Sequence, residues 1–168
     1  MLNADNICPS TPLYTCSGGN VVSIQLGSAA STAMNGTIST LIGRLTALTS
    51  LSLDGFKNLT STIPAGLNLL TNLASLSFFG CSLNGPLPVD NLTKMTYLRL
   101  GGNNFSGTLP IAKMTDLSFL SSSGQSFTGT LPSTMSLMSK LVVVYLFGNQ
   151  GLTGTVPDLS LLSNLVDL

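Results

Sequence analysis

The amino-acid sequence predicts an α/β solenoid: a right-handed coil with one parallel sheet of short strands, 3₁₀-like or irregular return segments and little α-helix. A Gly/Ser-x-apolar-Pro signature recurs through the chain at intervals of 24, 22, 22 and 25 residues, ending at Pro64, Pro88, Pro110, Pro132 and Pro157. Pairs of apolar residues two positions apart recur in step with these prolines, as expected for the buried side of a strand. A fixed period of this length is typical of a solenoid.

The clearest copy of the repeat spans residues 98–110. Leu98 and Leu100 face one way and Arg99 faces the other, because side chains alternate along a strand. The chain then turns at residues 101–103. We expect residues 107–110 to be extended and outside any ladder, because Pro110 has no N–H to donate.

The other elements follow in the same register. The core pairs of the six predicted strands are Ile24/Leu26, Leu51/Leu53, Leu76/Phe78, Leu98/Leu100, Leu120/Ser122 and Val144/Leu146. Leu168 falls where a seventh strand would start. Ser122 replaces a leucine, so repeat five should be the weakest coil, and Ser122→Leu should stabilise it by about 1–2 kcal/mol. Return segments such as residues 67–76 carry an apolar residue at every third position, which fits a 3₁₀ winding.

A polar corner position lies three residues after the second core residue of a strand. Asn103 holds it in the clearest copy, and Cys81, Gln125 and Asn149 hold it in the neighbouring copies. A side chain turned inward here would bond the backbone of adjacent coils. The alternative is an ordinary turn asparagine that tolerates a left-handed backbone.

The pattern Leu-x-x-Leu-x-Leu-x-x-Asn-x-Phe-Ser-Gly-Thr-Leu-Pro resembles the plant-type leucine-rich repeat. This family includes the ectodomains of receptor-like kinases and receptor-like proteins, and polygalacturonase-inhibiting proteins. The resemblance covers about residues 20–168 and implies that the strands line a concave face. It predicts an N-terminal cap with a cysteine pair at residues 1–20. Six repeats and the start of a seventh follow at residues 21–168, with no closing cap, so we expect the natural polypeptide to continue.

The resemblance also implies a disulfide between Cys8 and Cys16, since a cysteine pair precedes the first repeat in this family. The alternatives are two free thiols or half of a metal site, although the chain has no histidine to complete one. The Trp that the family usually carries between these cysteines is missing here, and Tyr14 is the nearest aromatic residue. Cys81 is predicted to be a buried, unreactive thiol.

Composition excludes several function classes. Charged residues make up 7% of the chain, the net charge is zero, there is no histidine and all six acidic residues are aspartates. We therefore expect no enzyme, cofactor or bound metal, because acid-base groups and ligands are too few. A neutral chain without a basic patch or a long apolar run also predicts no nucleic-acid binding and no membrane contact by this segment.

Four Asn-x-Ser/Thr sequons begin at Asn35, Asn58, Asn91 and Asn104. They are consistent with a glycosylated protein that is secreted or on the cell surface. The alternative is that they are by-products of the repeat itself.

The residues that alternate with the core leucines should face the concave surface. The first two strands offer small polar residues there. The later strands offer the candidate ligand-binding residues Phe79, Tyr97, Arg99, Phe119, Tyr145 and Phe147. Exposed aromatic residues with an arginine are typical of binding hot spots.

These features favour an extracellular recognition module that binds a protein, peptide or glycan ligand through its concave face. One alternative is a structural or adhesive surface protein without a single tight ligand. Another is the ectodomain of a receptor-like protein kinase.

Overall fold

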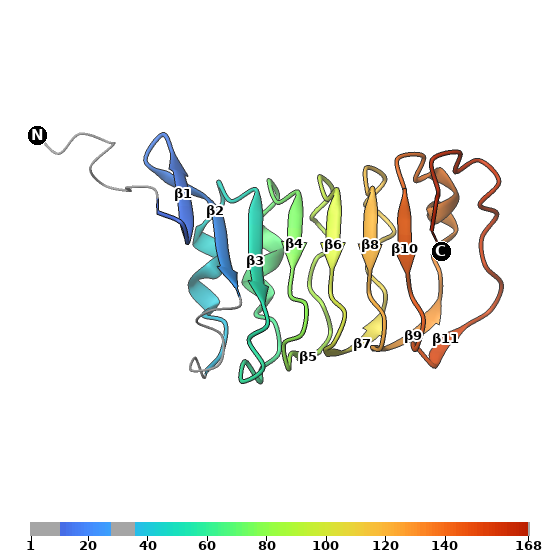
Figure 1. Cartoon of the computed structure of the whole chain (residues 1–168), viewed down its shortest axis with the longest axis horizontal. Helices are drawn as coiled ribbons and strands as arrows, with labels where there is room; N and C mark the ends of the chain where they lie inside the picture. The colour runs from blue at the N-terminus through green and yellow to red at the C-terminus, as the bar shows by residue number, and fades with distance from the viewer. Residues whose placement is uncertain (1–10, 28–35, 168) are drawn as a thin grey trace, which may run out of the picture.

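The computed structural model describes residues 11–27 and 36–167, which form a coil of parallel strands (Figure 1). The main sheet has seven strands in the order β1-β2-β3-β4-β6-β8-β10. Their bounds are β1 Tyr14–Ser17, β2 Asn20–Gly27, β3 Ser50–Asp54, β4 Ser75–Ser77, β6 Tyr97–Arg99, β8 Phe119–Ser121 and β10 Val143–Tyr145. All neighbouring strands from β2 onward pair in parallel, which confirms the predicted fold class.

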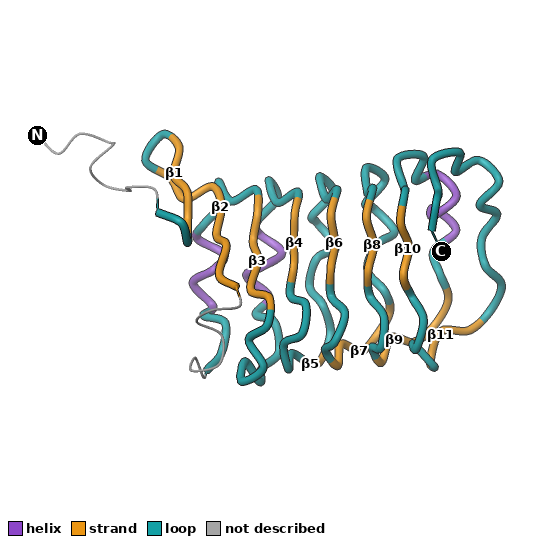
Figure 2. The backbone as a smooth tube through the Cα atoms, viewed as in Figure 1, coloured by secondary structure: helices purple, strands orange, loops and turns teal. Residues whose placement is uncertain are grey.

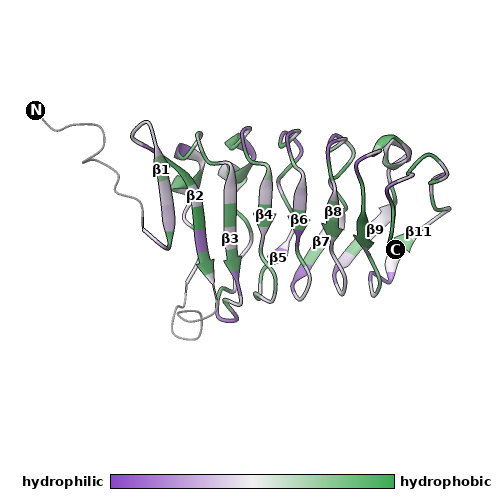
Figure 3. Cartoon of the chain, turned by 45° about the horizontal axis from the view of Figure 1, so that its top comes forward, coloured by the Kyte–Doolittle hydropathy of each residue, from purple (hydrophilic) through white to green (hydrophobic). Residues whose placement is uncertain are grey.

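The core lies behind this sheet and is built from the repeating apolar residues. Leu51, Leu76, Leu98, Leu120 and Val144 pair directly across neighbouring strands and are at most 1% exposed. Bands of hydrophobic and polar colour alternate along β2 and β3 (Figure 3). The predicted strand register is confirmed, and each coil buries its leucines against its neighbours, as in other solenoids.

In the described part of the chain, three return segments are 3₁₀-helices behind the sheet (Figure 2): η1 Thr40–Arg44, η2 Ala65–Leu69 and η3 Ser133–Leu137. Pro64 and Pro132 precede η2 and η3 with φ of −66°, which the proline ring fixes near the value that a helix start requires. Leu67 and Met135 point from these segments into the core and are fully buried. The 3₁₀ winding predicted from the period of three is therefore present in these segments, while the described segments that follow Pro88, Pro110 and Pro157 are irregular turns.

A second sheet follows the turn of each later coil, along the lower edge of the molecule in Figure 1. It has the order β11-β9-β7-β5 and contains β5 Asn84–Gly85, β7 Asn104–Thr108, β9 Ser126–Thr130 and β11 Gly151–Thr153. The expectation that residues 107–110 stay outside any ladder is wrong for Gly107 and Thr108, which pair with Phe127 and Thr128, whereas Leu109 and Pro110 lie outside β7. These strands were hard to predict because β7 and β9 each bury one side chain, Phe105 or Phe127, and otherwise consist of small residues.

The N-terminal edge of the main sheet is covered by β1, which pairs antiparallel with β2. Cys16 lies in β1 and is disulfide-bonded, whereas Cys81 is a free, buried thiol. Cys8 lies outside the described residues, so its pairing with Cys16 stays a prediction. A strand across the first coil shields a row of backbone groups that would otherwise be an open edge.

At the other end, Asp167 forms an isolated parallel bridge with Val143, and the Val144 N–H donates to the Asp167 carbonyl at 2.9 Å. This bridge lies where the sequence places the start of a seventh strand, although Leu168 itself is outside the described residues. Within residues 11–27 and 36–167, no helix is both long and apolar enough to cross a membrane.

Candidate functional site

The side chains on the concave face lie in rows, because neighbouring strands pair without a shift from β2 to β10. One row runs through Ser23, Ser50, Ser75, Tyr97, Phe119 and Val143, and a second through Gln25, Ser52, Ser77, Arg99, Ser121 and Tyr145. Serine thus occupies the β2–β4 part of the first row, and rings occupy its continuation over β6 and β8. We call Phe79, Tyr97, Phe119, Tyr145 and Phe147 the aromatic cluster.

Tyr97 and Phe119 are direct partners on β6 and β8, and their rings stack with centroids 4.6 Å apart and planes 10° apart. Parallel strands lie about 4.8 Å apart, so a stacked pair is the geometry that an unshifted register imposes. Both rings are half-buried. Such a pair contributes about 0.5–1.5 kcal/mol beyond its buried area and presents one fixed apolar surface.

Arg99 is held by two partners. Its Nη1 lies 3.2 Å from Asp54 Oδ2, and its Cζ lies 3.8 Å from the centroid of the Phe79 ring. Asp54 also accepts hydrogen bonds from the Ser77 hydroxyl at 2.6 Å and from the Phe79 N–H at 2.8 Å. Asp54 therefore connects β3 to the two strands beyond it, neutralises Arg99 and fixes the backbone that carries Phe79.

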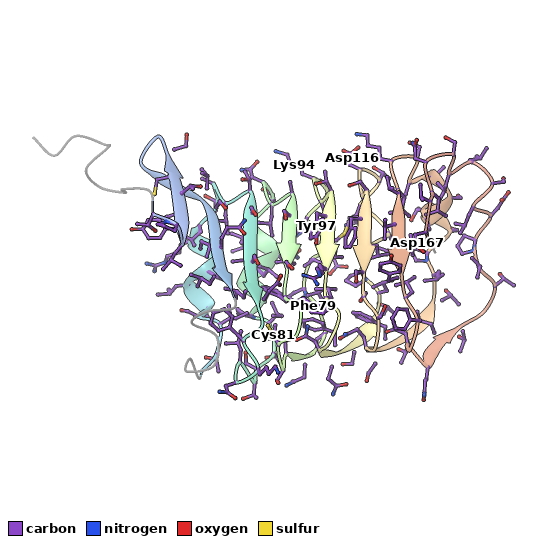
Figure 4. The ribbon with its side chains drawn as sticks, viewed as in Figure 1. Phe79, Cys81, Lys94, Tyr97, Asp116 and Asp167 are labelled. Carbon is purple, nitrogen blue, oxygen red and sulfur yellow. The ribbon has the colours of Figure 1, made fainter. Side chains whose placement is uncertain are left out.

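A groove of about 430 Å³ lies between Phe79 on one side and Tyr145 and Phe147 on the other. Phe79 is 41% exposed and Phe147 is 75% exposed, so both rings stand clear of the sheet. The floor between them consists of Gly101, Gly102, Ser121, Ser123 and Gly124. Figure 4 labels Phe79 and Tyr97, which lie over the central strands of this face.

The groove is open because its floor carries only glycines and the small side chains of two serines. A Cβ on Gly101 would lie 3.3 Å from two carbons of the Phe79 ring. The glycine thus lets the ring settle beside the strand and leaves the space above the floor empty. A larger residue at this position would move Phe79 or fill the groove.

Tyr145 has a partner at the edge of the groove. Its hydroxyl donates a hydrogen bond to the carboxylate of Asp167, which raises the pKa of Tyr145 above its ordinary value. Asp167 lies beside β10 at the end of the sheet (Figure 4). The hydroxyl is thereby oriented toward the end of the coil.

The corner residues under the site point inward, as one of the two sequence interpretations predicted. Asn103 Nδ2 donates to the carbonyls of Phe78 at 2.5 Å and Leu100 at 2.7 Å, and its Oδ1 accepts from the Leu83 N–H at 3.1 Å. Gln125 makes the corresponding bonds one coil later. These amides fix the turns from which the groove floor is built.

Cys81 holds the same corner position. Its Sγ donates to the Leu53 carbonyl at 2.9 Å, and burial raises the pKa of the thiol. A thiol with a raised pKa forms little thiolate at neutral pH and is a poor nucleophile. Cys81 therefore has a packing role.

Of the predicted glycosylation sites, Asn58, Asn91 and Asn104 are exposed, and Asn35 lies outside the described residues. Asn104 accepts a hydrogen bond from the Ser126 hydroxyl at 2.7 Å on the second sheet, away from the groove. Glycosylation at these positions stays a prediction.

The structure brings together the six candidate ligand-binding residues on one face, and it adds two residues that the sequence did not single out. Asp54 occupies a concave position on β3, and this position is the signal that could have identified it. Asp167 lies beyond the last complete strand and gave no such signal. Within residues 11–27 and 36–167, no three His, Cys, Asp or Glu side chains form a group that could hold a metal ion.

No protein-family model matches the sequence, and no curated protein matches it either. Solved structures do match. The LRR ectodomain of the receptor kinase SOBIR1 from Arabidopsis thaliana is 26% identical, with a TM-score of 0.71, over 80% of this chain and 74% of that chain. The plant peptide hormone receptor RGFR1, solved in complex with RGF2, is 30% identical, with a TM-score of 0.81, over 95% of this chain.

This chain spans 25% of the length of the RGFR1 chain. A plant ice-binding protein also matches, at 21% identity and a TM-score of 0.61, over 82% of this chain and 61% of that chain. At that identity the likeness concerns the fold alone.

Proposed function

We propose, from the premise that the chain is a plant-type leucine-rich repeat domain, that it is an extracellular recognition module for a protein or peptide ligand. The ligand binds the concave face over β4, β6, β8 and β10. The aromatic cluster makes the main contacts, and Arg99 supports it from the side.

The main support for this proposal is the unequal distribution of serine and aromatic side chains on the concave face. Ser23, Ser50 and Ser75 share a row with the stacked pair Tyr97 and Phe119. Aromatic residues bury large areas at low entropy cost and dominate binding hot spots, whereas serines rarely do. A group of half-buried and exposed rings on one half of the sheet therefore favours a defined binding site.

Two comparisons support this class of ligand. RGFR1 is a plant peptide hormone receptor whose structure was solved in complex with RGF2, and the SOBIR1 structure is the LRR ectodomain of a receptor kinase. By analogy with these two proteins, we propose that this domain is secreted or lies on the cell surface, and that it binds its ligand without catalysing a reaction. The similarity to SOBIR1 favours a domain that belongs to the ectodomain of a receptor-like kinase.

The test is capture of ligand with matched variants. The immobilised chain is exposed to extracellular fluid of its source organism, crosslinked, and its partners are quantified by mass spectrometry. Tyr97→Ala and Tyr145→Ala should each reduce capture of a genuine ligand by about fivefold or more, the effect of losing about 1 kcal/mol at a hot spot. Ser23→Ala and Ser50→Ala are the controls and should leave capture unchanged.

Loss of capture in the serine variants with full capture in the tyrosine variants would contradict the proposal. That result would favour an adhesive surface protein that uses its serine-rich half.

A further inference from the structure

We infer that the groove between Phe79 and Phe147 accepts an uncharged aromatic side chain of the ligand, and that Asp54 sets this preference by neutralising Arg99. This inference rests on the proposed function and defines the chemistry of its ligand. Asp54 is a specificity-determining residue that acts through Arg99 and Phe79.

The lining of the groove favours a ring over other groups. Its walls are aromatic, its floor is glycine and serine, and none of the described residues that line it is charged. Ring-to-ring contacts of the kind that Tyr97 and Phe119 already make are favourable for a further aromatic group. The groove is therefore suited to one apolar ring of the ligand.

A sugar fits less well. Buried hydroxyl groups must be hydrogen-bonded to offset the cost of leaving water. The lining offers two serine side chains and the Tyr145 hydroxyl, and that hydroxyl already donates to Asp167. The polar groups that remain are too few to satisfy the hydroxyls of a pyranose ring.

The charge beside the groove decides between neutral and anionic ligands. Arg99 pairs across the strands with Ser121 of the groove floor and stacks on Phe79 of the groove wall. Its charge would favour a carboxylate if it stood alone. Asp54 lies 3.2 Å from it, and both side chains are about one-third exposed, so the pair presents little net charge to a ligand.

The substitution Asp54→Asn removes the negative charge at residue 54 without removing the hydrogen bonds that hold Phe79 in position. The asparagine keeps an oxygen that accepts from the Ser77 hydroxyl and the Phe79 N–H, the two bonds that Asp54 Oδ1 receives now. It removes the negative charge opposite Arg99. We therefore expect Phe79 to stay in place while the groove gains an unpaired positive charge at its wall.

The experiment titrates the folded chain with two fragments and follows binding by heteronuclear NMR. N-acetylphenylalanine amide is neutral, and N-acetylphenylalanine carries a carboxylate on the same ring. The natural chain should bind the amide more tightly. Asp54→Asn should shift the affinity ratio toward the carboxylate by up to about fivefold, the effect of one unpaired charge roughly 4 Å away in water.

The matched control is Asp116→Asn, which breaks the ion pair between Asp116 and Lys140, 2.6 Å apart and outside the groove lining. This variant should leave the ratio unchanged. A natural chain that prefers the carboxylate, or an unchanged ratio in Asp54→Asn, would overturn the inference while leaving the groove as a site.

A second variant tests the site itself. Phe147 is 75% exposed, so Phe147→Ala should fold normally and lose both fragments. If both fragments bind Phe147→Ala as well as the natural chain, or neither binds the natural chain, then the groove is not the binding site. Binding of N-acetylglucosamine trimer in the groove without binding of the amide would identify a glycan ligand and overturn the aromatic preference.

Discussion

Replacing Ser122 by alanine should stabilise the coil. Ser122 follows directly after β8, occupies a core position and is 0% exposed, and its hydroxyl has no hydrogen-bond partner among the residues that the structure describes. Its backbone is fully used, because its N–H donates to the Tyr145 carbonyl and its carbonyl accepts from Asn149 Nδ2 at 2.7 Å. The substitution therefore removes a single unpaired oxygen and leaves the ladder intact.

The magnitude follows from the cost of burying a polar group. A buried hydroxyl without a partner costs about 1–3 kcal/mol. Removing it, with little change of volume, should raise the free energy of unfolding by about 1–2 kcal/mol. For a chain of this length each kcal/mol corresponds to about 2–4 °C in Tm. Urea titration followed by circular dichroism, and scanning calorimetry, measure the two quantities.

Ser77→Ala is the matched control. Ser77 is also a buried serine of the sheet, 6% exposed, but its hydroxyl donates to the Asp54 carboxylate at 2.6 Å. Its loss should lower the free energy of unfolding, so the two serine variants should change stability with opposite signs. An unchanged or lower Tm in Ser122→Ala would refute the reasoning, because it would show that the Ser122 hydroxyl has a partner in solution.

Two further predictions concern the corner and the end of the coil. Asn103→Ala should lower the free energy of unfolding by about 2–3 kcal/mol, because it leaves the Leu83 N–H and the Phe78 carbonyl without their amide partner, whereas the Leu100 carbonyl keeps its bond from Gln125 Nε2. The exposed Asn104→Ala should change the free energy of unfolding by less than about 0.5 kcal/mol. Urea titration measures both variants, and equal effects would contradict the inward corner. Tyr145 should ionise above its ordinary pKa in an ultraviolet titration, and Asp167→Asn should return the pKa of Tyr145 toward its ordinary value. Because the folded-state pKa is raised, the stabilisation from this hydrogen bond is present below the unfolded-state pKa. It is lost as the pH rises through the folded-state pKa. An unchanged titration in Asp167→Asn would contradict the assigned cause.

The prediction from sequence succeeded wherever a residue's role depends on its position within one coil. The core leucines of the main sheet, the 3₁₀ return segments and the inward Asn103 all follow from the repeat register. In a solenoid each coil repeats the environment of the one before it, so position in the repeat decides whether a side chain is buried. For the same reason the sequence placed all six candidate ligand-binding residues on one face.

The sequence did not predict the second sheet. The residues of β7 and β9 are mostly Ser, Gly and Thr, which carry no alternating apolar pattern. Their ladder forms because the coils are already aligned by the main sheet and by the buried rings of Phe105 and Phe127, whose centroids are 6.5 Å apart. Pairing here is a consequence of stacking and has little local signal.

By itself, then, the sequence determined the coil, its register and the face on which aromatic side chains gather. Only the tertiary structure decided how those side chains are paired. Asp54 and Arg99 are 45 residues apart and lie on strands that are not neighbours. Their ion pair depends on the rotamers of both side chains and on the reach of the long arginine across an intervening strand, which a repeat pattern does not encode. The groove likewise requires Phe79 and Phe147 to stand on either side of glycines from the coils between them, a relation that exists only once the coils are stacked.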